Sequence, residues 1–458
     1  MKPINNILIF VSSMCISLTA TTKQYTTANA VPKNVIVMIS DGCGYYHIDA
    51  ASIYQFGRPD GAVYERFPVK YAMSTYSASG AKYDPDNVWQ KFNSVEEKPT
   101  DSAAAATAMA GGVKACNGAI GIDPDKVPVE NVVERLEKLR KSTGVITSVQ
   151  FAHATPAAFV AHNESRKHYE VIARDMLTSQ IDVIMGAGHP FFDEDGLPVD
   201  HGDFQYVGGK ETWGEILHSV PMSDADHDGE LDAWSFIDDR AAFQKLMTGD
   251  TPKRLLGIAK VHGTLQVNRA NASHEQPFQA PFIESVPTLV EMSRAAINVL
   301  DNNPAGFFLM IEGGAIDWAS HDNHSGRMIE EEIDFNNSVQ TVVDWVEANS
   351  SWDETLVIVT GDHECGYLTG PNSGENNQPI WNPIQNNGKG KLPGMEWHKD
   401  GHTNALIPFF AKGAGSERFH SYAVNEDPHY GKYIDNADIG KQLMLMFTIS
   451  NAQYSGAN

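Results

Sequence analysis

Short runs of β-branched and other apolar residues recur along the chain, and each run ends in a turn rich in glycine, aspartate or histidine. Apolar runs of this length are typical of strands buried on both faces of a parallel sheet. The predicted strands lie at 35–39, 144–149, 181–185, 307–311 and 355–360, and the clearest helical patterns at 130–140 and 328–346. The sequence therefore predicts an α/β fold with a large, mostly parallel central sheet and helices on both faces.

The residues that follow three of these strands are of metal-binding types. Asp41 follows the first predicted strand, Glu312 the fourth, and Asp362 and His363 the fifth. Helix-connected parallel sheets place their ligands at the carboxyl ends of strands. Carboxylates and imidazoles there suit hard or borderline divalent cations.

Further candidate ligands lie outside the strands. Asp317 and His321 are four residues apart, so one turn of helix would direct both side chains toward one ion. His402 adds an imidazole in a Gly-His-Thr turn. Taken singly, such residues are ordinary turn, cap or surface groups. Their coincidence with the strand ends favours a metal centre.

An alanine-rich helical run over 103–109 follows Asp101 and Ser102. A serine or aspartate at this point is most often a helix cap. If Ser102 does more, the amide groups and dipole of the helix would favour an anion beside its hydroxyl. No Gly-x-Ser-x-Gly elbow surrounds it. Metal coordination could lower the pKa of the hydroxyl without a histidine base.

Composition and charge narrow the classes of partner. The chain has 458 residues, 42% of them hydrophobic, and a formal net charge of −24. This hydrophobic content is enough for a sizeable core and excludes global disorder. The acidic balance disfavours a surface that binds nucleic acid or an anionic membrane. It predicts a solvated acidic exterior.

The amino-terminal segment, residues 1–30, is predicted to be an export signal. A lysine precedes an apolar run over 7–18, which is too short to span a bilayer. Cleavage is expected between Ala20 and Ala30, leaving one domain over 31–458 in the periplasm or outside the cell. The remaining sequence has no apolar run long enough to span a membrane.

Two stretches are predicted to be surface insertions. Residues 193–239 are acidic and glycine-rich, and residues 370–401 are rich in asparagine, glycine and proline. The second stretch lies between candidate ligands and could cap the site. Within the first, 224–232 matches the opening of a calcium loop, but Ser235 stands where that loop needs a glutamate. We therefore favour a solvated acidic turn.

Cysteine usage is sparse. If Cys15 is removed with the signal, Cys43, Cys116 and Cys365 remain, which allows at most one intramolecular pair. Cys43 and Cys365 each lie close in sequence to a candidate ligand. They are either neighbours in space or small buried hydrophobic residues, and the second interpretation is favoured.

Taken in order, the candidate residues resemble the motifs of alkaline phosphatases. The matching motifs are Asp41-Gly42, Thr100-Asp101-Ser102-Ala103, His153-Ala154-Thr155-Pro156, Arg166, Glu312-Gly313, Asp317, His321, Asp362-His363 and Gly401-His402-Thr403. They cover nearly the whole chain after the signal. The resemblance implies a large, mostly parallel sheet between helices, usually in a homodimer, and hydrolysis of phosphate monoesters.

The resemblance also implies three metal sites, two for zinc and one for magnesium. The implied ligands are Asp317, His321 and His402 for the first zinc, Asp41, Asp362, His363 and the Ser102 oxygen for the second, and Asp41, Thr155 and Glu312 for magnesium. Three divalent cations would make the pocket cationic inside an acidic shell. The net charge of the protein is therefore no argument against a small anionic substrate.

In the implied reaction, two in-line displacements follow one another, with a phosphoserine at Ser102 between them. Arg166 would clamp two free phosphate oxygens, because its planar fork matches them. Asp101 would orient Arg166. A phosphodiesterase or sulfatase on the same scaffold is an alternative, but a clamp on two free oxygens favours monoesters. A catalytically silent metal or phosphate scavenger is another, and it would leave no phosphate on Ser102.

Two positions beside the implied metal sites depart from one bacterial pattern of the family. His153 stands where some members have aspartate, and Trp318 where others have lysine or histidine. Tryptophan cannot supply the charge of lysine, so we predict weak retention of phosphate and easy product release. Plain packing of Trp318 is the alternative. Imidazole at position 153 suits zinc better than magnesium, which leaves the identity of the third metal open.

Overall fold

The computed structural model describes residues 30–226, 228–270 and 276–448 of the 458. The predicted export signal, apart from Ala30, lies outside the described residues. In the part of the chain that is described, no helix is both long and apolar enough to cross a bilayer.

Within the described residues, one 11-stranded sheet runs through the molecule in the order β14-β15-β2-β13-β8-β1-β7-β3-β4-β6-β5. Its strands are β1 (Asn34–Ser40), β2 (Val69–Ser74), β3 (Ser142–Gln150), β4 (Val183–Ala187), β5 (Ser235–Ile237), β6 (Leu255–Ile258), β7 (Phe307–Gly313), β8 (Thr355–Gly361), β13 (Ile407–Gly413), β14 (Asn425–Asp427) and β15 (Gly431–Asp435). Two short ribbons pair β9 (Glu364–Cys365) with β12 (His402–Thr403), and β10 (Leu368–Thr369) with β11 (Glu396–Trp397).

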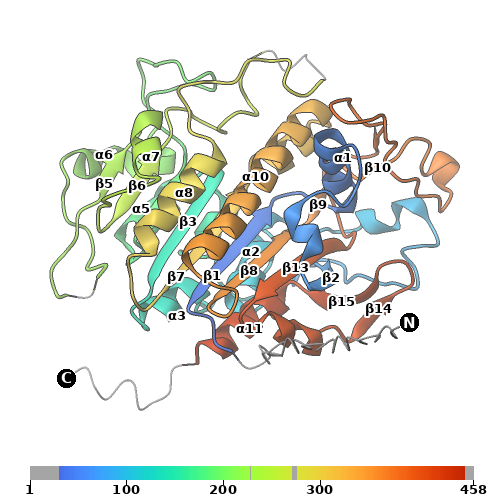
Figure 1. Ribbon diagram of the computed structural model, residues 1–458, viewed down its shortest axis with the longest axis horizontal. Helices are drawn as coiled ribbons and strands as arrows, with labels where there is room; N and C mark the ends of the chain where they lie inside the picture. Colours follow the sequence, from blue (N-terminus) through green and yellow to red (C-terminus); the bar gives the residue numbers. More distant parts are fainter. Residues whose placement is uncertain (1–29, 227, 271–275, 449–458) are drawn as a thin grey trace, which may run out of the picture.

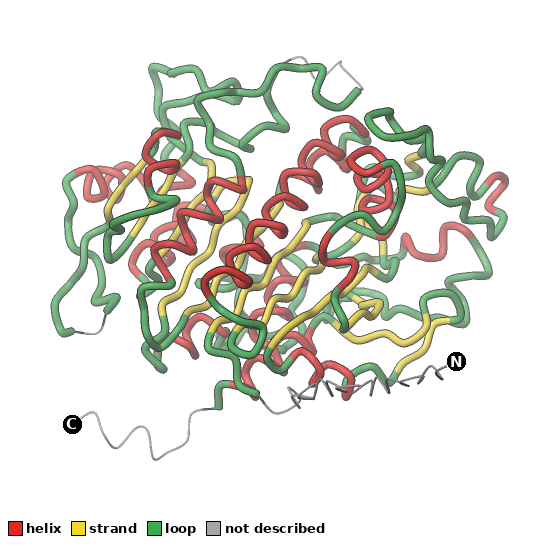
Figure 2. The backbone as a smooth tube through the Cα atoms, viewed as in Figure 1, coloured by secondary structure: helices red, strands yellow, loops and turns green. Residues whose placement is uncertain are grey.

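Helices cover both faces of the sheet (Figures 1 and 2). They are α1 (Tyr45–Phe56), α2 (Ser102–Gly111), α3 (Val132–Glu137), α4 (Ala154–Ala158), α5 (Tyr169–Thr178), α6 (Gly209–Leu217), α7 (Arg240–Lys245), α8 (Leu289–Leu300), α9 (Ala315–His321), α10 (Ser325–Asn349) and α11 (Ala437–Met446). Side chains alternate along β1. Val35 and Val37 pack with α2, α3 and α11, whereas Ile36 and Met38 pack with α1, α8 and α10.

The central strands explain where a site can form. β7 and β8 flank β1 and are parallel to it, and their registers pair Ser40 with Gly313 on one side and with Gly361 on the other. The three strands therefore end side by side. Whatever follows them in sequence must gather at one edge of the sheet.

The predicted α/β fold with a mostly parallel sheet is confirmed, because most neighbouring strands in the sheet run parallel. Each predicted strand is present, although 181–185 begins two residues later, at Val183. The antiparallel strand β13 was not predicted. Its apolar run resembles the others, and hydrophobic periodicity does not report strand direction.

The two segments predicted as insertions contain more ordered structure than their composition indicates. Within 193–239, α6 buries Trp213, and β5 forms an edge of the main sheet. In the acidic turn over 224–232, the side chain of Asp226 is exposed and pairs with Lys253 at 2.5 Å. At the end of 370–401, the carbonyl of Asp400 accepts a hydrogen bond from Nδ1 of the predicted ligand His321.

Candidate active site

The strand-end residues form one buried group, as the register requires. The ligand atoms of Asp41, Asp362 and His363 all lie within 4.8 Å of one another. His363 Nε2 is 3.1 Å from Asp362 Oδ2 and 3.6 Å from Asp41 Oδ1. Glu312, at the end of β7, is fully buried and accepts a hydrogen bond from Thr147. All four predicted strand-end residues therefore lie at one edge of the sheet.

Burial makes negative charge costly at this edge. Burial, reinforced by the charge of Asp362, raises the pKa of Asp41. Burial raises the pKa of Asp362 to about 6 and that of Glu312 to about 7. A cation stabilises ionised carboxylates that desolvation would otherwise protonate, and metals bind the deprotonated form. The group thus has the electrostatic character of a cation site.

A second ligand group joins helix α9 to strand β12. Asp317 lies 3.4 Å from the Nε2 atoms of both His321 and His402, and these two nitrogens are 3.1 Å apart. The Nδ1 atom of each imidazole donates to a backbone carbonyl, that of Asp400 or Thr100. These bonds turn both Nε2 atoms inward, the arrangement in which histidines bind metals.

A proton occupies this second group if no metal does. Two inward Nε2 lone pairs at 3.1 Å repel each other unless a positive charge lies between or beside them. Hydrogen bonding to Asp317 raises the pKa of His321 to about 9. Because protons and metals compete for the same nitrogen, a divalent cation would replace that proton.

The buried polar atoms test whether cations fit. The oxygen atoms at the site that have no hydrogen-bond partner among the described residues are Asp41 Oδ1, Thr155 Oγ1, Glu312 Oε1, Asp317 Oδ1 and Asp362 Oδ2. Leaving such an atom unsatisfied costs about 1–3 kcal/mol, and more for a charged group. Oxygen atoms of this kind, beside imidazoles, are suitable donors for divalent cations. The residues present therefore fit the metals that the sequence predicts.

Ser102 lies at the amino terminus of α2, next to the strand-end group. Asp101 caps the helix by accepting from the amide of Ala104 at 3.1 Å. Ser102 is itself buried, and its Oγ lies 3.2 Å from His363 Nε2. The serine therefore lies beside a candidate metal ligand and at the amide groups of a helix start, which favour an anion.

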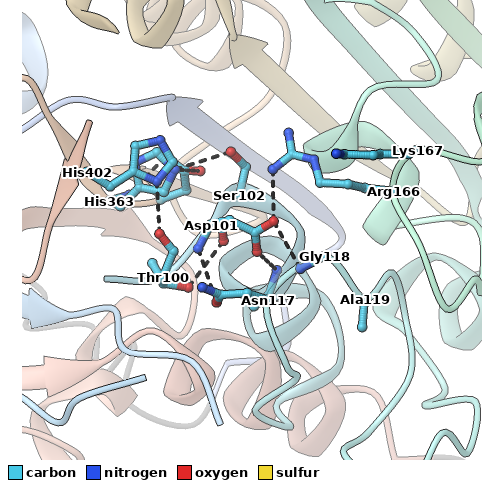
Figure 3. A network of polar contacts seen from close by, with 12 residues as sticks. Thr100, Asp101, Ser102, Asn117, Gly118, Ala119, Arg166, Lys167, His363 and His402 are labelled. Carbon is cyan, nitrogen blue, oxygen red and sulfur yellow. Dashed lines mark hydrogen bonds and ion pairs between the residues drawn. The ribbon is translucent and has the colours of Figure 1, made fainter. Parts of the chain in front are cut away.

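Arg166 faces Ser102 from the opposite side (Figure 3). Its Nη1 donates to Asp101 Oδ2 at 3.0 Å, and both side chains are mostly buried. The same carboxylate oxygen accepts from the amide of Gly118 at 3.0 Å. The carbonyl of Gly118 in turn accepts a hydrogen bond from the amide of Arg166 at 2.7 Å. Asp101 thus holds the guanidinium through a closed set of hydrogen bonds.

Comparison with known proteins agrees with this arrangement. The family model for alkaline phosphatase matches residues 32–395. The chain belongs to the alkaline phosphatase family. Alkaline phosphatase 3 and alkaline phosphatase 4 of Bacillus subtilis are 30% and 31% identical to it, over 73% and 75% of this chain. The matched part spans only 61% and 64% of those two relatives.

A solved member of the family has the same overall fold. The alkaline phosphatase of the Antarctic bacterium TAB5 superposes with a TM-score of 0.61 at 26% identity, covering 91% of this chain and 98% of that one. The enzyme of Escherichia coli K12 is 28% identical over 72% of this chain and 70% of its own length. The large mixed sheet is therefore the alkaline phosphatase fold.

The two positions that depart from one pattern of the alkaline phosphatase family are neighbours. The rings of His153 and Trp318 are 5.7 Å apart, and Tyr169 lies on the other side of His153 at 6.2 Å. Burial, followed by the nearby Arg166 charge, lowers the pKa of His153 to about 3. His153 is therefore a neutral imidazole. Trp318 also packs against the apolar core, so it has the packing role that was the alternative interpretation of its sequence position.

Sequence reasoning missed three residues of this alkaline phosphatase site. The side chain of Asn117 accepts a hydrogen bond from the amide of Asp101 at 3.3 Å and donates one to the carbonyl of Pro99 at 2.9 Å. Thr147 donates to Glu312, and Cys365 joins the group of Asp317. Nothing in the local sequence distinguishes Asn117 or Thr147, and Cys365, although close to Asp362 in sequence, was interpreted as a small buried hydrophobic residue. They reach the site through strand pairing and turns that bring distant segments together.

Proposed function

We propose that this member of the family hydrolyses phosphate monoesters to an alcohol and inorganic phosphate through a phosphoserine at Ser102. The observation that carries the proposal is the position of the Ser102 hydroxyl. It lies between His363, at 3.2 Å, and the guanidinium of Arg166, at the start of a helix. A nucleophile, a cation site and an anion clamp thus face the same small volume.

The residues of the chain have distinct tasks in this reaction. Ser102 Oγ attacks phosphorus as its proton passes to solvent, and the ester oxygen departs with its bonding electron pair and takes a proton from solvent to form the alcohol. Water then attacks the phosphoserine and gives up a proton to solvent, while Ser102 Oγ leaves with its bonding electron pair and is reprotonated. Arg166 donates to two non-bridging oxygens and neutralises their charge in both transition states. Asp101 keeps the guanidinium in place, so its orientation is fixed before substrate arrives.

The proposed metal ligands are those expected from the sequence, with two zinc ions and one magnesium ion. The ligands are Asp317, His321 and His402 for the first zinc, Asp41, Asp362, His363 and Ser102 for the second, and Asp41, Thr155 and Glu312 for magnesium. When bound, the cations would supply Lewis acidity to the serine oxygen and to the departing ester oxygen. The unpartnered oxygens and inward imidazoles described above support this assignment.

At the level of the whole protein, we infer a single exported catalytic domain over 31–458, in the periplasm or outside the cell. Insertions near 193–239 and 370–401 belong to it, and the working form is a homodimer. The apolar run at the amino terminus supports export.

The proposal is tested by trapping the intermediate. The purified protein is mixed with a labelled phosphate monoester, quenched in acid and digested, and the labelled peptide is identified. We expect label on Ser102 and none in S102A, whose kcat should fall on the order of 10³-fold or more. Chelation should abolish turnover, and zinc with magnesium should restore it. Full activity in the metal-free protein would overturn the mechanism.

Substrate class is decided by a parallel assay. Phosphate diesters and sulfate esters are compared with a monoester of the same alcohol. We expect kcat/KM to be highest for the monoester, because Arg166 has two free oxygens to bind only there. Comparable turnover of the diester would instead favour phosphodiesterase chemistry. Metal binding without turnover of any ester would indicate a scavenger.

A further inference from the structure

Cys365 lies beside the ligand group of Asp317, His321 and His402. Strands β9 and β12 pair antiparallel in a register that sets Cys365 opposite His402. Opposite residues on such a ladder have side chains on one face, with Cβ atoms about 4.5–5.5 Å apart. The sulfur accordingly joins the group, whose ligand atoms all lie within 4.8 Å of one another.

The thiol has no strong competing partner among the described residues. Cys365 is fully buried and is not part of a disulfide. Its Sγ donates only to the Asp317 carbonyl, at 3.9 Å, and a thiol is a weak donor. Cys43 provides the contrast. It is equally buried and near Asp41, but its Sγ contacts the carbonyl of Gly44 and joins none of the ligand groups found among the described residues.

An independent observation indicates that a ligand belongs within this group. Asp317 is 6% exposed, and its Oδ1 has no hydrogen-bond partner in the described part of the chain. The imidazoles of His321 and His402 are held from behind by backbone carbonyls, so their Nε2 atoms point into the group. A carboxylate oxygen, two imidazole nitrogens and a sulfur therefore converge.

We propose that Cys365 is a fourth protein ligand of the cation held by Asp317, His321 and His402. The S–H bond breaks as the metal–sulfur bond forms, and the proton leaves to solvent. Two nitrogens, one oxygen and one thiolate would give four protein donors, all of types that bind zinc. Thiolate also selects soft or borderline ions, so the site prefers zinc or cadmium to magnesium.

This ligand set deepens the proposed function and rests on it for the role of the site. With three protein ligands, a tetrahedral zinc keeps one position open. Cys365 would hold the cation as a fourth protein ligand, and a bound zinc would still supply Lewis acidity to the departing ester oxygen, because zinc permits five-fold coordination. Cys365 therefore tunes metal retention at the position where the alcohol departs.

Cobalt substitution tests the sulfur ligand directly. Metal-free protein is loaded with cobalt(II), and its near-ultraviolet absorption is recorded for wild type, C365S and C43S. We expect a sulfur-to-cobalt charge-transfer band in wild type and in C43S, and none in C365S. The same variant should lose cadmium affinity by at least the roughly 10- to 100-fold that follows loss of a residue that merely orients a ligand.

A second measurement needs no variant. X-ray absorption of the zinc-loaded wild-type protein should contain a sulfur neighbour at about 2.3 Å. A shell of only nitrogen and oxygen, or a charge-transfer band that survives in C365S, would overturn the proposal. Monoester hydrolysis is measured on the same samples. A sulfur shell without hydrolysis would refute the phosphatase while leaving the ligand, and hydrolysis without sulfur would do the reverse.

Discussion

Two groups of buried carboxylates in this protein differ in how their oxygens are satisfied. On α10, Glu330 accepts from Arg269 at 2.8 Å, and Glu332 accepts from Ser40 at 2.6 Å. At the edge of the sheet, by contrast, Asp41 and Asp362 each keep an oxygen without a hydrogen-bond partner among the described residues. Burial is complete or nearly so in both groups.

The difference identifies the site better than burial does. Buried carboxylates that are paired or hydrogen-bonded hold a fold together, and natural proteins leave few buried polar atoms unsatisfied. Several unsatisfied oxygens at one edge, beside inward imidazoles, therefore indicate a partner that is not part of the chain. By this criterion the α10 carboxylates are structural, and the edge carboxylates are functional.

The largest effect should come from a matched pair of amide substitutions. D362N keeps the oxygen that accepts from Gly42 and His363 but removes the negative charge. We expect kcat/KM to fall by about 10³-fold or more, since a direct ligand should cost more than a residue that orients one. E332Q should keep its activity. Metal content and monoester kinetics of both variants, side by side, provide the check.

The next effect concerns stability, on the structural side of the comparison. Arg269 and Glu330 are almost fully buried as a pair. R269A leaves the buried Glu330 carboxylate with Arg327, at 3.4 Å, as its remaining ion-pair partner. The substitution should therefore cost about 3 kcal/mol in the free energy of unfolding, the lower end of the range for breaking a buried ion pair. Urea denaturation measures the loss. The kcat of the protein that remains folded should be unchanged. A fall in kcat of the folded protein would contradict the assignment of Arg269 and Glu330 to a structural role.

Removal of the phosphate clamp should have a slightly smaller effect. R166A deletes a mostly buried guanidinium that is oriented by Asp101. We expect kcat/KM for a monoester to drop about 10²-fold, the order lost with one preorganised charge-stabilising donor. Metal content should stay at the wild-type level. Diester turnover should fall less, and an equal fall for both esters would refute the clamp.

The position of Trp318 should give a moderate change in product affinity. Its ring lies 5.7 Å from that of His153, tilted at 60° to it, and supplies no charge. W318K would add a cation near the phosphate position and should tighten inhibition by inorganic phosphate about tenfold, the value of a modest charge-assisted hydrogen bond. W318F serves as the packing control. Weaker phosphate inhibition in W318K would contradict the prediction of easy product release.

The last prediction concerns how the stability of the protein changes with pH, and it involves no change in activity. Burial, with the charges of Asp334 and Glu330 against that of Arg269, raises the pKa of Glu331 to about 8, from an ordinary value of 4.5. The folded state therefore binds this proton more tightly than the unfolded state. The contribution of Glu331 to stability is therefore lost as pH rises from about 4.5 to 8 and then levels off. Unfolding of E331Q should show a shallower decline over this range, and identical slopes would rule out the titration.

Much of the site was predictable because several of its residues directly follow strands that the sequence predicts. Asp41, Glu312 and Asp362 each follow an apolar run, and parallel strands must place such residues at one edge. Ser102 was recognisable through the resemblance to alkaline phosphatase motifs, because a serine before an alanine-rich helix is by itself most often a cap. Asn117 and Cys365 were not, because their roles depend on hydrogen bonds and strand pairing between segments more than ten residues apart.

By itself, the sequence determined the α/β class, the succession of buried strands and the order of the site residues. Those features follow from local periodicity and from side-chain chemistry, both of which a single chain displays. Only the tertiary structure decided that Ser40 meets Gly313 and Gly361, that β13 runs antiparallel, and that a cysteine faces His402. Register and direction depend on pairing between strands far apart in sequence, which no local pattern specifies.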